Sequence, residues 1–268
     1  MDSVLGTSRG RSVRLVPFLF GVAGQDELPG PALLRLLGDL GLSPGAGRAL
    51  IARLRGEGHL STTRRGRHVS YRLDGDLARG FHRLRSGPTA EVTWPGHFHA
   101  LVYQVPEDER AFRDRLRRAA ILKGFGILIP GVLISLHDRF HDLADVLQEA
   151  PASARIHPAR LQLAEPDAAS AAAAAWDLPA LNEILRGHVA RLTSAPAVPL
   201  PTGAAALREL NDLLGPVYVD MLRAPVLPAQ LRPADWAMPE LRAEMGRVSR
   251  ALHQPVADHL AAVTGERR

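Results

Sequence analysis

The spacing of hydrophobic residues in the first third of the chain predicts a series of short helices. An apolar run at residues 15–24 suits a buried first helix. From Pro31 to Leu40 the leucines recur at helical spacing, and Gly41 ends that segment. The arginines before the apolar run also resemble the start of a secretory signal. No small-x-small cleavage site follows the run, so we favour the core helix.

A second helix is predicted after a short turn. Ser43 suits its N-cap and Pro44 its first position, and we expect the helix to extend to about Glu57. At 100° per residue, one face points inward and the opposite face points to solvent. The predicted inward face contains Ala46, Leu50 and Leu54, and the outward face contains Arg48, Ala52 and Arg55, with Arg53 on the flank.

A β-hairpin is predicted to follow this helix pair. Residues 60–64 and 69–73 have strand character, and Arg65-Gly66-Arg67 forms the turn between them. Two helices joined by a short turn and followed by a hairpin are typical of a winged helix-turn-helix. In that arrangement Arg48 and Arg55 face bases or the DNA backbone. The hairpin arginines Arg64, Arg65 and Arg67 supply salt-sensitive contacts to phosphates.

The charge distribution supports nucleic acid as a partner. Residues 1–87 contain fourteen arginines against seven acidic residues. Residues 88–150 contain seven basic and nine acidic residues, and residues 151–268 contain twelve of each. A basic excess confined to one module indicates an acidic partner such as DNA. A general preference for arginine over lysine is one alternative explanation, and a winged helix that docks on protein is another.

The middle of the chain predicts a small α/β layer. Residues 97–103 have the pattern of a strand and residues 107–122 that of an amphipathic helix. Residues 127–134 predict a second strand, interrupted or bulged at Pro130. A strand, helix and strand in this order indicate one compact layer with a helix on its face.

The last part of the chain predicts helices separated by proline-rich loops. An alanine-rich segment at residues 168–175 precedes helical patterns near 181–192, 204–222 and 240–263. We therefore expect an α+β protein with three domains at residues 1–87, 88–165 and 166–268. Apolar space between the last helices predicts a small-molecule effector site, with ordinary core packing as the alternative. Its candidate residues are Trp176, Tyr218, Met221 and Trp236.

Composition excludes several classes of site. The chain has no cysteine, which removes disulfides and thiolate metal ligands. No stretch reaches 18 uninterrupted apolar residues, so no membrane-spanning helix is predicted.

His137 and His141, spaced i and i+4, leave a metal role open, and His97 and His99 form a weaker His-x-His pair. No nucleophile elbow or phosphate loop is present, and we expect neither catalysis nor a cofactor.

Several segments, taken together and in order, resemble the PaaX family of transcriptional regulators of phenylacetic acid degradation. The resemblance covers roughly residues 12–255. The segments that carry it are residues 43–54 with Gly58-His59-Leu60, Trp94-Pro95-Gly96, Arg115-Leu116-Arg117 with Gly124-Phe125-Gly126 and Pro130-Gly131-Val132, Trp176-Asp177-Leu178 with Leu181-Asn182, and Leu227-Pro228 with residues 231–236.

The resemblance implies an N-terminal winged helix, a ferredoxin-like middle domain similar to small CRISPR-associated nucleases, and a helical C-terminal domain. It also implies a cytoplasmic homodimer that binds double-stranded DNA and represses transcription. An acyl-CoA such as phenylacetyl-CoA would release this dimer from the DNA. Two positions depart from the family pattern. Gln104 stands where the nucleases carry a metal-binding Asp, and residues 219–226 are less aromatic than is usual. A metal-dependent nuclease or hydrolase built on the middle domain is the alternative function.

Overall fold

The computed structural model describes residues 12–66, 68–75, 77–79, 82, 93–195 and 200–265. The chain forms two compact units built from interleaved segments. We call one the central unit, which lies within Pro88–Ile184 and Arg223–Ala237. The other is the terminal unit, which lies within Asp2–Gly87, Leu185–Leu222 and Met238–Arg268. The predicted division into three consecutive domains stays a prediction.

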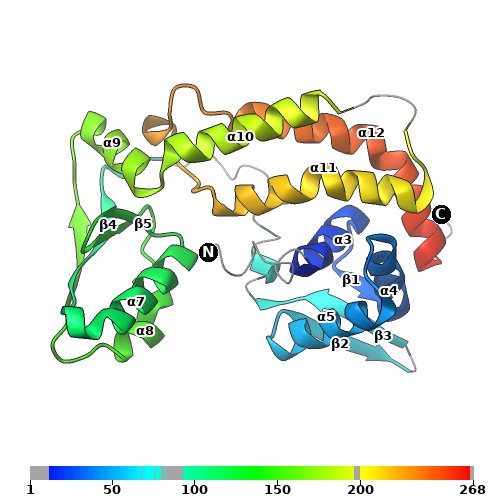
Figure 1. Ribbon diagram of the computed structural model, residues 1–268, viewed down its shortest axis with the longest axis horizontal. Helices are drawn as coiled ribbons and strands as arrows, with labels where there is room; N and C mark the ends of the chain where they lie inside the picture. The colour runs from blue at the N-terminus through cyan, green and yellow to red at the C-terminus, as the bar shows by residue number, and fades with distance from the viewer. Residues whose placement is uncertain are drawn as a thin grey trace. The chain divides into compact units, whose positions relative to one another are not determined.

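The first part of the terminal unit combines helices with a three-stranded sheet (Figure 1). The sheet has the strand order β1-β3-β2, and both strand pairs are antiparallel. Sequence patterns missed β1, because a three-residue strand containing a proline has no alternating signal. The elements are α3 (Leu15–Ala23), β1 (Glu27–Pro29), α4 (Gly30–Asp39), α5 (Pro44–Gly56), β2 (Leu60–Arg65) and β3 (His68–Leu73).

Helix α5 begins where the sequence predicts. The Ser43 hydroxyl accepts a hydrogen bond from the backbone N–H of Ala46 at 3.3 Å, so Ser43 is the N-cap. The buried face contains Gly47, Leu50, Ile51 and Leu54. The inward prediction for Ala46 is wrong, because Ala46 lies in the first turn and is exposed.

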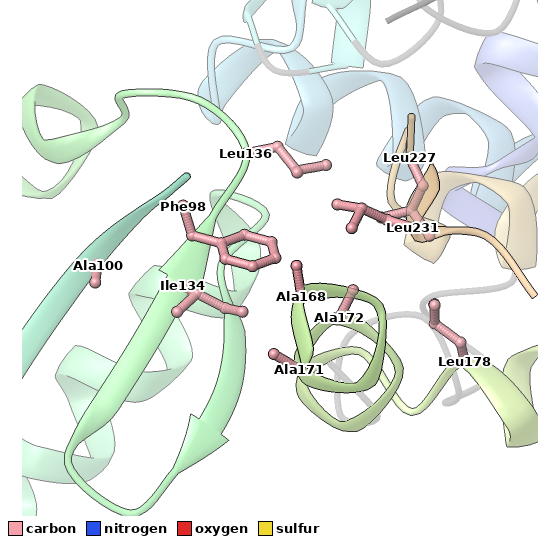
Figure 2. Packing of buried hydrophobic residues seen from close by; sticks show 10 residues of the cluster. All are labelled: Phe98, Ala100, Ile134, Leu136, Ala168, Ala171, Ala172, Leu178, Leu227 and Leu231. Carbon is pink, nitrogen blue, oxygen red and sulfur yellow. The ribbon is translucent and has the colours of Figure 1, made fainter. Parts of the chain in front are cut away.

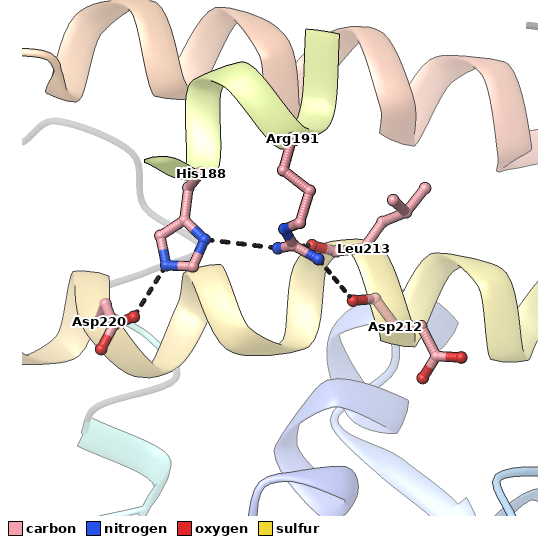
Figure 3. A network of polar contacts seen from close by, with 5 residues as sticks. All are labelled: His188, Arg191, Asp212, Leu213 and Asp220. Atoms are coloured by element: carbon pink, nitrogen blue, oxygen red, sulfur yellow. Dashed lines mark hydrogen bonds and ion pairs between the residues drawn. The ribbon is translucent and has the colours of Figure 1, made fainter. Parts of the chain in front are cut away.

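The last helices complete the terminal unit. They are residues 185–193 of α10 (Leu178–Thr193), with α11 (Gly203–Arg223) and α12 (Met238–Thr264). Pro216 lies inside α11 and cannot donate a hydrogen bond to the carbonyl of Asp212. Arg191 of α10 donates to that carbonyl at 3.0 Å and to the carbonyl of Leu213 at 2.7 Å (Figure 3). The Nε2 atom of His188 lies 2.8 Å from an Asp220 carboxylate oxygen, which gives a second polar contact between α10 and α11.

The central unit is built on a four-stranded antiparallel sheet with the order β5-β6-β4-β7. Helices separate the strands in the chain order β-α-β-β-α-β, which is the split βαβ arrangement. The elements are β4 (Phe98–Gln104), α7 (Arg110–Leu122), β5 (Gly126–Ile129), β6 (Val132–Ser135), α8 (Ala144–Gln148), β7 (Arg155–Leu161) and α9 (Glu165–Ala175), with short 3-10 helices at Glu107–Glu109, Phe140–Leu143 and Ala229–Leu231.

The segment predicted as one interrupted strand at residues 127–134 forms two strands. β5 and β6 pair antiparallel, so Pro130 and Gly131 form a turn and not a bulge. Gly131 has a φ of 87°, which an L side chain rarely adopts. A Cβ at Gly131 would also lie 2.8 Å from the carbonyl oxygen of Tyr103. The Pro-Gly pair therefore reverses the chain at this point.

Each face of the central sheet has its own core. On one face, Leu101 and Leu133 pack with Phe112 and Leu116 of α7. On the other, Phe98 and Ile134 face the small side chains of α9 (Figure 2). Alanines let α9 approach the sheet closely, and a Cβ on Gly126 would lie 2.7 Å from the carbonyl oxygen of Ala175.

The loop before α12 closes the second core of the central unit. Leu227 and Leu231 pack into the cluster around Phe98. Buried Asn182 of α10 fixes the end of this loop, because its amide donates to the carbonyl of Asp235 at 3.1 Å and accepts from the N–H of Ala237 at 2.9 Å. A buried amide that both donates and accepts in this way holds an irregular segment in one conformation.

Helices and antiparallel sheets in one chain agree with the predicted α+β class. Among the described residues, no helix is both long and apolar enough to cross a membrane.

Candidate nucleic-acid interface

The outward face of α5 carries the predicted basic side chains. Arg48, Ala52 and Arg55 are exposed, as their spacing predicts. No ion pair joins Arg48 or Arg55 to a carboxylate among the residues that the structure describes. Both guanidinium groups are therefore available to an anionic partner, and Ala52 between them allows close approach.

The hairpin carries a further exposed arginine. Arg64 lies in β2 opposite Val69 and is exposed. Arg65 lies opposite His68, and the backbone places it at the end of β2. Arg67 lies outside the described residues, so its predicted role stays a prediction. Helix α5 packs against β2, so the exposed helix face and the hairpin belong to one substructure.

Two other arginines of this region already have carboxylate partners. Arg53 lies 4.0 Å from Glu57 one helical turn later, and both side chains are partly exposed. Arg72 of β3 lies 3.7 Å from Glu27 of β1. Sequence reasoning missed the second pair because it missed β1. Exposed pairs of this kind are weak, so neither arginine is lost to an anionic partner.

The predicted effector residues divide between the two units. Trp176 and Trp236 belong to the central unit, where both pack against the cluster around Phe98. The Trp176 indole also donates to the carbonyl of Gly124 at 3.4 Å. Tyr218 and Met221 lie on α11 in the terminal unit, and burial raises the pKa of the Tyr218 phenol. The four-residue site therefore stays a prediction.

One described cavity has none of these four residues in its wall. It has a volume of about 490 Å³ and lies between the start of α11 and the second half of α12. Its wall consists of Thr202, Gly203, Gln254, Pro255, Asp258, His259 and Ala262.

The histidines of the central unit form a loose cluster. The rings of His97 and His99 are 5.3 Å apart between centroids. Burial lowers the pKa of His99, although Asp138 opposes the shift. Burial, helped by Arg139 and His99, also lowers the pKa of His137.

Within the described part of the chain, no three metal-ligating side chains are grouped closely enough to hold an ion. His141 lies 3.4 Å from the carboxylate of its neighbour Asp142. Gln104 is exposed at the end of β4.

Comparison with known proteins places the central unit in a family. Residues 91–173, which include the four strands and most of α9, match the family model described as the PaaX protein central Cas2-like domain. Through this domain, the chain resembles the PaaX family. The predicted PaaX resemblance is thus confirmed, and with it the coarser functional prediction of a PaaX-like transcriptional regulator.

A solved structure supports this fold over nearly the whole PaaX-like chain. The uncharacterized protein Rv0674 from Mycobacterium tuberculosis is 25% identical, with a TM-score of 0.57. The match covers 94% of this chain and 99% of that one. None of the curated proteins compared with the chain matches it.

Proposed function

We propose that this protein is a ligand-responsive transcriptional repressor that binds double-stranded DNA through residues 12–73. One observation carries the proposal: Arg48 and Arg55 are exposed on the helix that follows the turn, next to a hairpin that carries Arg64. The helix, strand, two helices and hairpin follow each other in the order of a winged helix-turn-helix.

The proposed binding mode places α5 in the major groove. Arginine can form two hydrogen bonds to the edge of a guanine, and the hairpin arginines then contact phosphates. A dimer would present two such helices to a pseudo-palindromic operator, with half-sites one or more helical turns apart. We therefore expect a homodimer in the cytoplasm.

The proposed effector is an acyl-CoA-type small molecule that releases the operator. It can act only by binding the DNA-competent and DNA-incompetent forms with different affinities. Aromatic side chains are sparse at residues 219–226, so we expect the acyl group to be something other than phenylacetyl.

The test begins with selection of binding sites. The full chain is incubated with a random double-stranded DNA library, and the enriched sequence is titrated by fluorescence anisotropy against a scrambled duplex. We expect a two-fold symmetric motif bound at least about a thousand times more tightly than the scramble. Enrichment of no motif, or equal affinity for the two duplexes, contradicts the proposal.

The effector and the alternative function need separate measurements. Acyl-CoA thioesters and their free acids are screened for a thermal shift and then for release of the selected duplex. Release by none of them contradicts the acyl-CoA assignment and leaves the operator result intact. Incubation of labelled DNA with Mg²⁺ or Mn²⁺ tests the nuclease alternative, because cleavage requires a metal held by the protein.

A further inference from the structure

The turn between α4 and α5 is held by two side chains from the far end of the chain. Asp39 is the last residue of α4. The Nε atom of Arg208, on α11, donates to the Asp39 carbonyl oxygen at 2.6 Å. The Nε2 atom of His259, on α12, lies 2.8 Å from an Asp39 carboxylate oxygen. The backbone carbonyl and the carboxylate of Asp39 are therefore both engaged by C-terminal helices.

These contacts meet a local need of the turn. The last carbonyls of a helix lack partners within the helix, and a cation near them is favourable. The turn's own backbone bonds end on the carbonyls of Leu36, Leu37 and Gly38. Arg208 supplies the donor for the next carbonyl in the series, that of Asp39.

The carboxylate contact is partly buried. The His259 side chain is 11% exposed and the Asp39 side chain 21% exposed. Removal of either partner would leave the other polar group partly buried and without a hydrogen-bond partner. The free-energy cost of that state is larger than the stabilisation that an exposed ion pair gives. Among the polar side chains beside His259 on α12, Gln254 already donates to Asp258 at 2.7 Å.

From this geometry we infer that Arg208 and His259 are positioning residues of the DNA-binding module. This inference rests on the proposed function. The two side chains fix Asp39, and Asp39 fixes the turn that sets the angle between α4 and α5. His259 also lines the cavity between α11 and α12, so a molecule bound there would contact one of the two groups that hold the turn.

The experiment compares His259→Leu and Arg208→Met with matched controls on the full chain. His253→Leu and Arg250→Met remove the same side-chain types from exposed positions of α12. Each protein is titrated with the selected operator and with the scrambled duplex at one salt concentration. Hydrogen exchange is followed by mass spectrometry in peptides that cover residues 36–46.

We expect both test variants to exchange faster at residues 36–46 and to bind the operator about tenfold more weakly, which corresponds to the loss of one charge-assisted hydrogen bond. Affinity for the scrambled duplex should change much less, because phosphate contacts tolerate a small change of pose. His259→Gln, which keeps an N–H donor, should recover most of the operator affinity. A purely structural role would lower both affinities in step with the folded fraction, and that result overturns the inference.

The inference is also overturned if His259→Leu and Arg208→Met both fold and show unchanged hydrogen exchange and unchanged operator affinity. If His259→Leu does not fold, Asp39→Ala replaces it, because that change removes the carboxylate that faces His259. Normal operator affinity and normal exchange in Asp39→Ala would then decide against the inference. If the wild-type chain binds no DNA, the proposed function fails, and the exchange data alone show whether Arg208 and His259 hold the turn.

Discussion

Arginine residues of the proposed DNA-binding module differ in what their guanidinium groups already contact. Arg48, Arg55 and Arg64 face solvent, whereas Arg53 and Arg72 have carboxylate neighbours. Residue spacing predicts which arginines point outward from α5, because helical geometry fixes the directions of the side chains. The partner of Arg72 is Glu27, which lies on β1, a strand distant in the sequence. No local sequence pattern predicts that pair.

Replacement of Arg48 by alanine tests base recognition. If Arg48 contacts a base edge, Arg48→Ala should weaken specific operator binding by about 1–3 kcal/mol and relax the preference at one position. Arg118→Ala, an exposed arginine on α7 of the central unit, is the matched control. Anisotropy titrations in which both variants bind like the wild type would remove Arg48 from the interface.

Replacement of Arg64 by alanine tests phosphate contact. A side chain that neutralises one phosphate releases about one counterion, so Arg64→Ala should reduce the slope of log affinity against log salt by about one. Specific and scrambled duplexes should lose affinity alike, because the contact carries no sequence information. A slope equal to that of the wild type, measured between about 50 and 200 mM salt by the standard counterion analysis, would place Arg64 away from the backbone.

The two histidines of the central unit with lowered pKa values predict a dependence of stability on pH. The ordinary histidine pKa is about 6.5. Since burial lowers the pKa of His99 and His137 in the folded state, the unfolded chain binds more protons as the pH falls through that value. The contribution of each neutral histidine is fully present at a pH well above about 6.5 and is lost on acidification until the pH lies below the lowered native value.

Tryptophan fluorescence can measure this loss, because Trp94, Trp176 and Trp236 all belong to the central unit. The melting temperature should fall between about pH 7.5 and pH 5, a range that spans the ordinary histidine pKa, and His99→Asn should make that fall smaller. His157→Asn, an exposed histidine in β7, serves as the control. An equal fall in His99→Asn and in the wild type would show that His99 does not contribute.

At the scale of elements, a side chain of α10 donates to a backbone carbonyl of α11 that a proline leaves without its usual donor. Pro216 leaves the Asp212 carbonyl without its usual donor, and Arg191 of α10 donates to it and to the Leu213 carbonyl (Figure 3). Arg191 also lies 3.4 Å from Nδ1 of His188. The proline thus fixes where α10 must contact α11.

A double-mutant cycle separates this contact from ordinary packing. Arg191→Met should destabilise the terminal unit by about 1–3 kcal/mol, because a helix carbonyl loses its partner. In a Pro216→Ala background the same change should cost clearly less, since the substituted alanine supplies a backbone N–H to the Asp212 carbonyl. Urea unfolding followed by circular dichroism gives the four free energies of unfolding. An equal cost of Arg191→Met in both backgrounds contradicts the assignment.

Most elements are predictable from local patterns, and the failures have physical reasons. The long helices between α3 and α12 follow apolar spacing, caps and prolines, so their ends lie within a few residues of the predicted ones. Sequence patterns predict the β5–β6 pair as one strand, because Pro130 also suits an interrupted strand and only the antiparallel register identifies the turn. Contacts such as His259 with Asp39 join residues 220 positions apart, which no local pattern reveals.

At the scale of the whole molecule, chain order and compact units do not coincide. The terminal unit takes its parts from both ends of the sequence, and α12 packs against α3 and α4. The Arg14 guanidinium occupies the space where a Cβ on Gly215 of α11 would stand. An N-terminal module whose helices bury apolar and polar groups against α11 and α12 depends on those helices for part of its stability.

This dependence predicts that residues 1–87 on their own are less stable than the same residues in the full chain. The isolated fragment exposes apolar surface of α3 and α4, and Asp39 loses both Arg208 and His259. Urea unfolding by circular dichroism should show a lower midpoint or no cooperative transition, and addition of a separate 185–268 fragment should raise the midpoint. Because the tryptophans lie in the central unit, fluorescence of the full chain reports that unit separately. A fragment 1–87 that unfolds at the midpoint of the full chain's terminal unit would show that the N-terminal module is an independent domain.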